Sequence, residues 1–126
     1  FKEYLSKADE EILIVIQLET REAVENADDI LSVEGIDAFM IGPADLSTSL
    51  GFRGDWERKE VEEVFYRLLE AGKRNGVAAG LFAPGIESAK KWIKEGFQFV
   101  CVGADMGFLI NGSLSALKEL RGIRSR

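Results

Sequence analysis

Residues 34–41, Glu34-Gly35-Ile36-Asp37-Ala38-Phe39-Met40-Ile41, place a short apolar run directly after a glycine. The same pattern returns at Asn75-Gly76, which leads into residues 77–82, and at Glu95-Gly96, which leads into residues 97–102. Each glycine suits the left-handed turn that ends a helix, and each apolar run has the length of a buried strand. The sequence therefore predicts helices that end at these glycines and strands that begin just after them.

A fourth apolar strand, over residues 12–18, opens the series, and Thr20 behind it is a suitable N-cap for a helix. Between and after the strands, apolar residues recur at helical spacing. We expect these residues to form the packing faces of four helices: Val24, Ala27, Ile30 and Leu31; Val61, Phe65, Leu68 and Leu69; Ile86, Ala89, Trp92 and Ile93; and Ile110, Leu114 and Leu117.

Four strands that alternate with four helices predict an α/β fold with parallel strands, because each helix returns the chain to the same edge of the sheet. Two architectures fit this pattern, an open doubly wound sheet and part of a closed (β/α)₈ barrel. A full barrel takes about 250 residues, so four units in 126 residues match half a barrel. We expect residues 1–126 to form one partial barrel domain, completed either by an N-terminal half absent from this sequence or by a second copy.

Composition narrows the class of partner. The chain is 46% hydrophobic and 30% charged, as in folded globular proteins, and its net charge of -6 argues against binding to nucleic acid or to an anionic membrane. Its apolar stretches are shorter than the roughly 20 residues of a membrane span, and the N-terminus does not resemble a signal peptide. We expect a cytoplasmic protein whose partner is a small molecule or another subunit. The single cysteine, Cys101, lies in an apolar run and is expected to be buried.

In both architectures, ligands bind at the carboxyl ends of the strands. Gln17 and Glu19 are two residues apart at one strand end and point to the same side, while Asp45 follows the next strand, about 4.8 Å away. Oxygen ligands of this kind favour a hard cation such as Mg²⁺ or Mn²⁺. The alternative interpretation places Glu19 in the first turn of a helix and makes Asp45 an N-cap.

The segment Gly42-Pro43-Ala44-Asp45-Leu46-Ser47 predicts a tight turn into a helix, whose free N–H groups would suit a substrate carboxylate. Other polar and aromatic residues have simpler interpretations. We expect Trp56 and Trp92 to lie on helices as packing or subunit-contact residues, and Asp105 to cap the last helix.

Several motifs, in order, resemble the second half of the HpcH/HpaI aldolases. They are Val15-Ile16-Gln17-Leu18-Glu19-Thr20-Arg21-Glu22-Ala23, Val33-Glu34-Gly35-Ile36-Asp37, Ile41-Gly42-Pro43-Ala44-Asp45-Leu46-Ser47, Ala83-Pro84 and Phe99-Val100-Cys101-Val102-Gly103-Ala104-Asp105. The resemblance covers nearly the whole chain. It implies the C-terminal four β/α units of a TIM (β/α)₈ barrel, in an enzyme that cleaves or forms 4-hydroxy-2-oxo acids from pyruvate and an aldehyde with a divalent metal.

The resemblance also implies roles for individual residues. Glu19 and Asp45 would bind the metal, which is Mg²⁺, Mn²⁺ or Co²⁺, and Gln17 would be the catalytic residue that lines the substrate site. Backbone amides at Gly42, Ala44 and Asp45 would hold the carboxylate of pyruvate, and residues 81–82, with Phe82 foremost, would border the aldehyde.

The remaining family features lie outside these residues. The family's general-base His, its Asp partner and a substrate-polarising Arg come from the first half of the barrel, and this sequence contains no His. We therefore expect this half to be inactive alone. Relatives commonly form hexamers in which the last helix is exchanged, which implies a homo-oligomer with Leu114, Leu117 and Leu120 against a neighbour.

Two other functions fit the same residues. One is a non-catalytic half-barrel that self-associates through its open strand edges. The other is a related citrate-lyase or malyl-CoA-type lyase that acts on thioesters. The Gly-Pro-Ala-Asp-Leu-Ser turn is closer to the aldolase branch.

Overall fold

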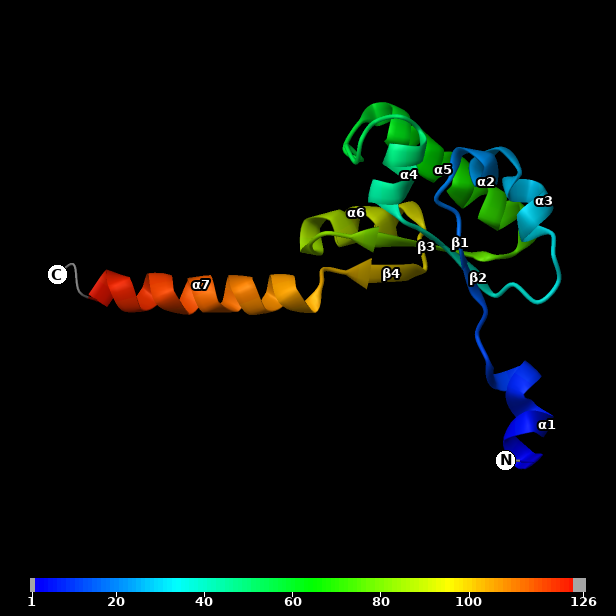
Figure 1. The fold of residues 1–126 in the computed structure, drawn as a ribbon, viewed down its shortest axis with the longest axis horizontal. Coiled ribbons are helices and arrows are strands. Elements are labelled where there is room, and N and C mark those ends of the chain that lie inside the picture. Colours follow the sequence, from blue (N-terminus) through cyan, green and yellow to red (C-terminus); the bar gives the residue numbers. More distant parts are fainter. Residues whose placement is uncertain (1, 124–126) are drawn as a thin grey trace.

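The computed structural model describes residues 2–123 and contains one four-stranded parallel sheet (Figure 1). The strands lie in the order of the chain, which confirms the predicted parallel β/α pattern. Their bounds are β1 (Val15–Gln17), β2 (Ala38–Ile41), β3 (Ala78–Ala83) and β4 (Phe99–Val102).

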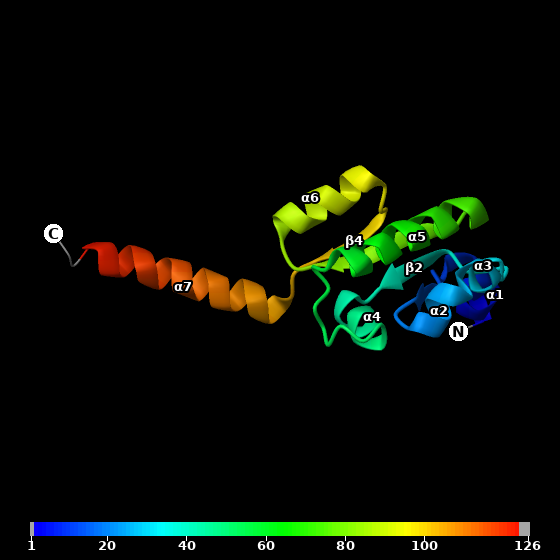
Figure 2. The same ribbon diagram turned by 90° about the horizontal axis from the view of Figure 1, so that it is seen from above.

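Helices follow each strand and also extend both ends of the chain (Figures 1 and 2). Gly76 and Gly96 end two of them in the left-handed conformation, with φ of 71° and 112°, as predicted, whereas the helix before Gly35 ends already at Leu31. The Thr20 side chain accepts the N–H of Ala23, also as predicted. The helices are α1 (Lys2–Glu11), α2 (Arg21–Glu25), α3 (Ala27–Leu31), α4 (Pro43–Ser49), α5 (Lys59–Asn75), α6 (Ile86–Glu95) and α7 (Asp105–Ile123).

The core lies on the side of the sheet where α3, α5 and α6 pack. Alternate strand residues point to this side, and Phe39, Ile41 and Leu81 are fully buried there. On α6, Trp92 packs edge-on against Phe65 of α5, with ring centroids 5.4 Å apart. These contacts confirm Trp92 as a packing residue.

No helix of residues 2–123 packs on the other side of the sheet (Figure 1). Gln17, Met40, Gly80 and Phe99 share one register row on this side, and Phe99 is 37% exposed. The sheet is therefore covered on one face, as expected for a section of a barrel wall rather than for a doubly wound sheet with helices on both faces.

Several predicted element details are wrong. The strand predicted over residues 12–18 is only β1, because its partner β2 begins at Ala38, opposite Val15. Just before β1, the carbonyl of Ile14 still accepts the backbone N–H groups of Asp37 and Ala38. The predicted helix after Thr20 is broken at Asn26 into α2 and α3.

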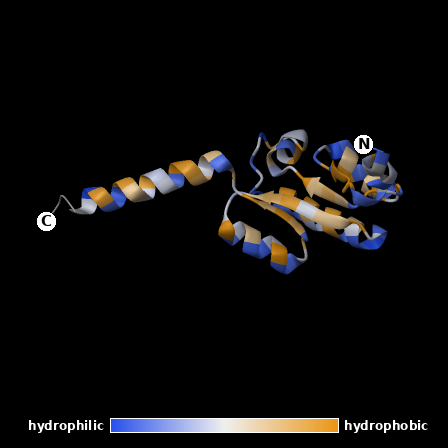
Figure 3. Cartoon of the chain, turned by 90° about the horizontal axis from the view of Figure 1, so that it is seen from below, coloured by the Kyte–Doolittle hydropathy of each residue, from blue (hydrophilic) through white to orange (hydrophobic). Residues whose placement is uncertain are grey.

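Some predicted packing faces are also wrong. Ile86 and Ile93 are exposed because α6 turns the neighbouring face, with Ala89 and Trp92, toward the sheet. The apolar residues of α7 are exposed as well, because this helix extends away from the sheet and contacts little of it (Figure 3). No helix within residues 2–123 is long and apolar enough to cross a bilayer.

A side-chain cluster joins α3 to the end of α5. Arg74 donates to both carboxylate oxygens of Asp28, at 3.1 Å from Nε to Oδ1 and 2.8 Å from Nη2 to Oδ2, and Asn75 donates to Oδ1 at 3.0 Å. The hydrogen bonds from Arg74 hold the pKa of Asp28 below its usual 3.8. The ionised form of Asp28 is therefore favoured in the folded state.

We expect Asp28→Asn to lower the melting temperature of the full-length protein by a few degrees at most at neutral pH, because the pair is exposed. A lowered folded-state pKa contributes stability above the unfolded pKa, and this contribution is lost as the pH falls through the folded value. The difference in Tm from wild type should shrink below about pH 4. Asp29→Asn, one residue along α3, is the control. A difference that persists unchanged at pH 2 would contradict this account.

Candidate functional site

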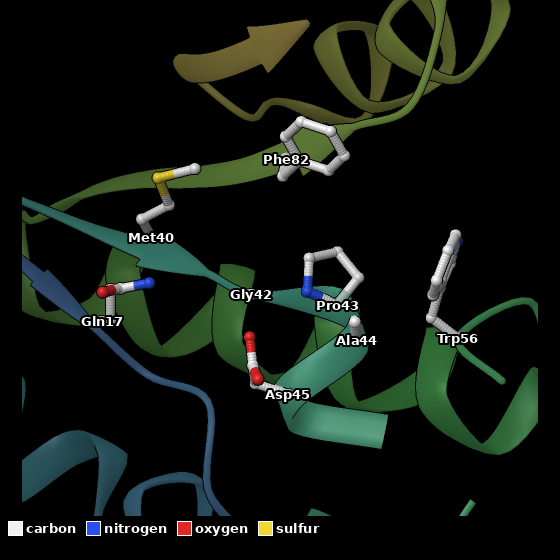
Figure 4. Close-up of a pocket in the computed structure, with 8 residues that line it drawn as sticks. All are labelled: Gln17, Met40, Gly42, Pro43, Ala44, Asp45, Trp56 and Phe82. Carbon is white, nitrogen blue, oxygen red and sulfur yellow. The ribbon is translucent and has the colours of Figure 1, made fainter. Parts of the chain in front are cut away.

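A cavity of about 260 Å³ lies at the carboxyl end of the strands, beside the first turn of α4 (Figure 4). Parallel strands bring their carboxyl ends to one edge, so residues far apart in sequence meet here. The cavity is lined by residues from β1, β2, β3, α4 and the loop before α5: Gln17, Met40, Gly42, Pro43, Ala44, Asp45, Trp56 and Phe82.

Two carboxylates converge on Gly42. A Cβ atom built on Gly42 would lie 2.5 Å from Oε2 of Glu19 and 3.3 Å from Oδ2 of Asp45, so both oxygens are within 3.3 Å of one point. Gln17 donates from Nε2 to the same Oε2 of Glu19 at 3.0 Å, which fixes that carboxylate from the side of β1. The missing side chain of Gly42 therefore leaves room for two acidic groups to meet.

Strand register explains this convergence. Gln17 of β1 pairs with Met40 of β2, and two residues further along, Glu19 and Gly42 lie next to each other. Asp45 reaches the same point from the first turn of α4. The prediction that Gln17 and Glu19 point to the same side is confirmed by their hydrogen bond.

The alternative interpretation of the two carboxylates is wrong in its details. Glu19 lies before Thr20, which is the N-cap of α2, so Glu19 is outside that helix. Gly42 is the N-cap of α4, and Asp45 lies in its first turn. Neither acid caps a helix, although the position of Asp45 near the positive end of α4 is favourable for its charge.

The first turn of α4 presents backbone amides next to the two acids. Leu46 is the first residue of this helix whose N–H bonds within it, to the carbonyl of Gly42 at 2.9 Å. The N–H groups of Ala44 and Asp45 come before it and have no acceptor inside the helix, while Pro43 has no N–H. The turn therefore offers two donors beside two acceptors.

The structure brings together the residues that the sequence singled out. Gln17, Gly42, Ala44, Asp45 and Phe82 all line the cavity, and Glu19 contacts Gln17 at its edge. By contrast, the expectation for Leu81 is wrong, because its side chain points to the opposite side of β3 and is buried in the core.

Sequence reasoning missed three lining residues. Met40 lies two positions before Gly42 on the same side of β2, so strand alternation was the signal that could have found it. Pro43 belongs to the turn at residues 42–47 that the sequence predicts, so the turn motif was the signal for it. Trp56 lies in the loop between α4 and α5 rather than on a helix, and no local pattern indicated its position.

Comparison with known proteins identifies the family of this chain. The family model described as HpcH/HpaI aldolase/citrate lyase matches residues 2–112. The chain belongs to this family. The predicted resemblance to the HpcH/HpaI aldolases is thereby confirmed.

Two curated relatives and one solved structure show how far the similarity extends. A hydroxypyruvate/pyruvate aldolase from Delftia acidovorans is 37% identical over 123 residues, which cover 98% of this chain and 46% of the relative. A 4-hydroxy-2-oxo-heptane-1,7-dioate aldolase from Escherichia coli is 37% identical over 107 residues, covering 85% of this chain and 41% of the relative. The crystal structure of an HpcH/HpaI family protein from Burkholderia cenocepacia superposes with a TM-score of 0.91 at 35% identity, over 95% of this chain and 47% of that one.

The chain therefore spans about half the length of the curated relatives that it matches. Structural neighbours from this family have TIM-barrel-like folds, so the four β/α units described above correspond to half of such a barrel. Of the two architectures that the sequence left open, the barrel is confirmed.

We expect Gly42→Ala to weaken Mn²⁺ binding by the full-length protein about 10- to 100-fold, because the new methyl group would displace the Glu19 carboxylate. Gly85→Ala is the matched control. Gly85 is also the N-cap of a helix and has extended backbone, but nothing lies within 4 Å of its Cβ position. Isothermal titration measures both affinities. Wild-type affinity in Gly42→Ala would show that the two carboxylates do not share one cation.

Proposed function

We propose that this chain is the cation- and keto-acid-binding half of a metal-dependent aldolase that cleaves 4-hydroxy-2-oxo acids to pyruvate and an aldehyde. The observation that carries the proposal is that carboxylate oxygens of Glu19 and Asp45 both lie next to Gly42, at a cavity on the carboxyl edge of the sheet. The family supports the reaction class, since the relatives described above are named as aldolases.

The residues present fit a hard divalent cation. Glu19 and Asp45 offer two carboxylates beside Gly42, and within residues 2–123 no group of three or more His, Cys, Asp or Glu side chains is placed to hold a metal. Mg²⁺ commonly takes one or two protein carboxylates and fills its other positions with water and substrate oxygens. We therefore favour Mg²⁺ or Mn²⁺, with Co²⁺ as a further possibility. When bound, such a cation supplies positive charge that stabilises an enolate oxygen.

The chain's own groups position the keto acid. The amides of Ala44 and Asp45 are free to donate to the carboxylate of pyruvate, and the positive end of α4 favours an anion there. Gln17 holds the Glu19 carboxylate by its hydrogen bond, which makes it a positioning residue, and its place on the cavity wall also allows direct contact with substrate.

Proton transfer has to come from outside these 126 residues. In the cleavage direction a base takes the proton of the 4-hydroxyl group, the C3–C4 bond breaks, and its electron pair passes into the enolate of pyruvate, which is then protonated at C3. The sequence has no His, and no Lys lines the part of the cavity that the structure describes. We infer that a group supplied by the rest of the barrel or by another subunit performs both transfers, and that this half alone does not turn over.

Assembly belongs to the same proposal. The apolar residues of α7 are exposed, among them Leu114, Leu117 and Leu120 at 58%, 43% and 63%. Exposed apolar stripes of this kind indicate a protein contact. We propose that α7 packs against a neighbouring subunit of a cytoplasmic homo-oligomer, with a hexamer as the expected form.

The experiment that tests the proposal is an assay of pyruvate release from 4-hydroxy-2-oxoheptane-1,7-dioate by the full-length protein. We expect release with Mg²⁺ or Mn²⁺ and its loss after EDTA treatment, followed by recovery when the cation is restored. Asp45→Asn should abolish release, whereas Asp105→Asn, a strand-end acid that bonds only to the N–H of Met106 among the described residues, should retain it.

Three results would contradict the proposal. Full activity after EDTA treatment would exclude the cation. Release only from a hydroxyacyl thioester would favour the citrate-lyase or malyl-CoA type of lyase, and a stable oligomer that binds neither Mn²⁺ nor pyruvate would favour the non-catalytic half-barrel.

A further inference from the structure

Trp56 lies on the cavity wall without a part in binding the cation or the keto acid. It belongs to the loop between α4 and α5, and the loop is held by backbone hydrogen bonds from Phe52 to Ser47 at 2.8 Å and from Asp55 to Phe52 at 3.0 Å. The Arg58 guanidinium lies 4.9 Å from the centre of the Phe52 ring and braces the same loop. Trp56 is therefore placed at the cavity by an ordered segment, although 36% of it is exposed.

The cavity has a polar end and an apolar end. Gln17 and Asp45 lie at the polar end, next to the meeting point of the two carboxylates, while Pro43, Trp56 and Phe82 form the apolar end (Figure 4). Since the keto acid occupies the polar end in the proposed function, the second substrate must extend toward the apolar end.

The charge of the cavity wall affects which aldehyde can bind as the second substrate. Among the described residues that line the cavity, Asp45 is the one that carries charge, and it is an anion. An aldehyde that ends in a carboxylate would find no cationic partner among these residues, and losing water without one costs free energy. An apolar ring would instead bury its surface against Trp56 and Phe82, whose faces and edges suit aromatic contacts.

We propose that Trp56 is a specificity-determining residue and that the aldehyde accepted at this site carries an uncharged, aromatic group. The inference rests on the proposed function. In the condensation direction C3 of the pyruvate enolate forms a bond to the aldehyde carbon, the π-electron pair of the aldehyde C=O moves to its oxygen, and that oxygen takes a proton. The aromatic group of the aldehyde packs on Trp56 during this step.

The test compares three aldehydes in condensation with pyruvate by the full-length protein with Mg²⁺: benzaldehyde, acetaldehyde, and 4-oxobutanoate, the anionic aldehyde that cleavage of 4-hydroxy-2-oxoheptane-1,7-dioate releases. Wild type should have a higher kcat/KM for benzaldehyde than for 4-oxobutanoate. Trp56→Ala should lower kcat/KM for benzaldehyde about tenfold and leave that for acetaldehyde nearly unchanged. Trp56→Phe should keep most of the benzaldehyde activity, because it restores an aromatic surface.

Deuterium exchange into the methyl group of pyruvate, measured by NMR without aldehyde, separates this inference from the proposed function. Exchange that is equal in wild type and Trp56→Ala, with a changed aldehyde preference, supports the role of Trp56. Equal exchange with an unchanged preference overturns it, as does a wild-type preference for 4-oxobutanoate. Absence of exchange in wild type would instead refute the proposed function itself. Glu57→Ala is the control, since Glu57 lines the outer groove that Trp56 also borders but does not line the cavity.

Discussion

The close approach of two carboxylates above Gly42 is the constraint on which the site depends. Two carboxylates that share a small space repel each other, and a cation between them offsets that repulsion. Any side chain at position 42 would occupy the space that the Glu19 and Asp45 oxygens share. The glycine is therefore needed for the space that it leaves, and its backbone, with φ of -89°, does not require a glycine.

One face of the sheet stabilises the fold, and the other face carries the candidate site. The face toward α3, α5 and α6 buries Phe39, Ile41 and Leu81 and holds the strands in register. The same register places Gln17 beside Met40 on the open face and so brings Glu19 to Gly42. Packing of side chains on one face of β2 therefore positions the polar side chains on its other face. In a TIM barrel, likewise, the site lies at the carboxyl ends of the strands.

Sequence reasoning could predict the parts of this structure that depend on local patterns. Glycine helix ends, apolar strands and period-2 alternation identified the four β/α units and placed Gln17, Gly42 and Asp45 at the strand ends, while the family resemblance added Phe82. Features that depend on tertiary placement could not be predicted in this way. The loop that carries Trp56 has no periodic signal, and α6 and α7 expose apolar residues at helical spacing because no element of the described chain covers them.

The most direct measurement is an anomalous-difference map from crystals of the full-length protein grown with Mn²⁺. We expect one peak per chain next to Gly42, within bonding distance of an oxygen of Glu19 and an oxygen of Asp45. Metal–oxygen bonds of this kind are roughly 2.0–2.2 Å long. A peak bound by only one of these carboxylates, or a peak elsewhere with none next to Gly42, would contradict this expectation.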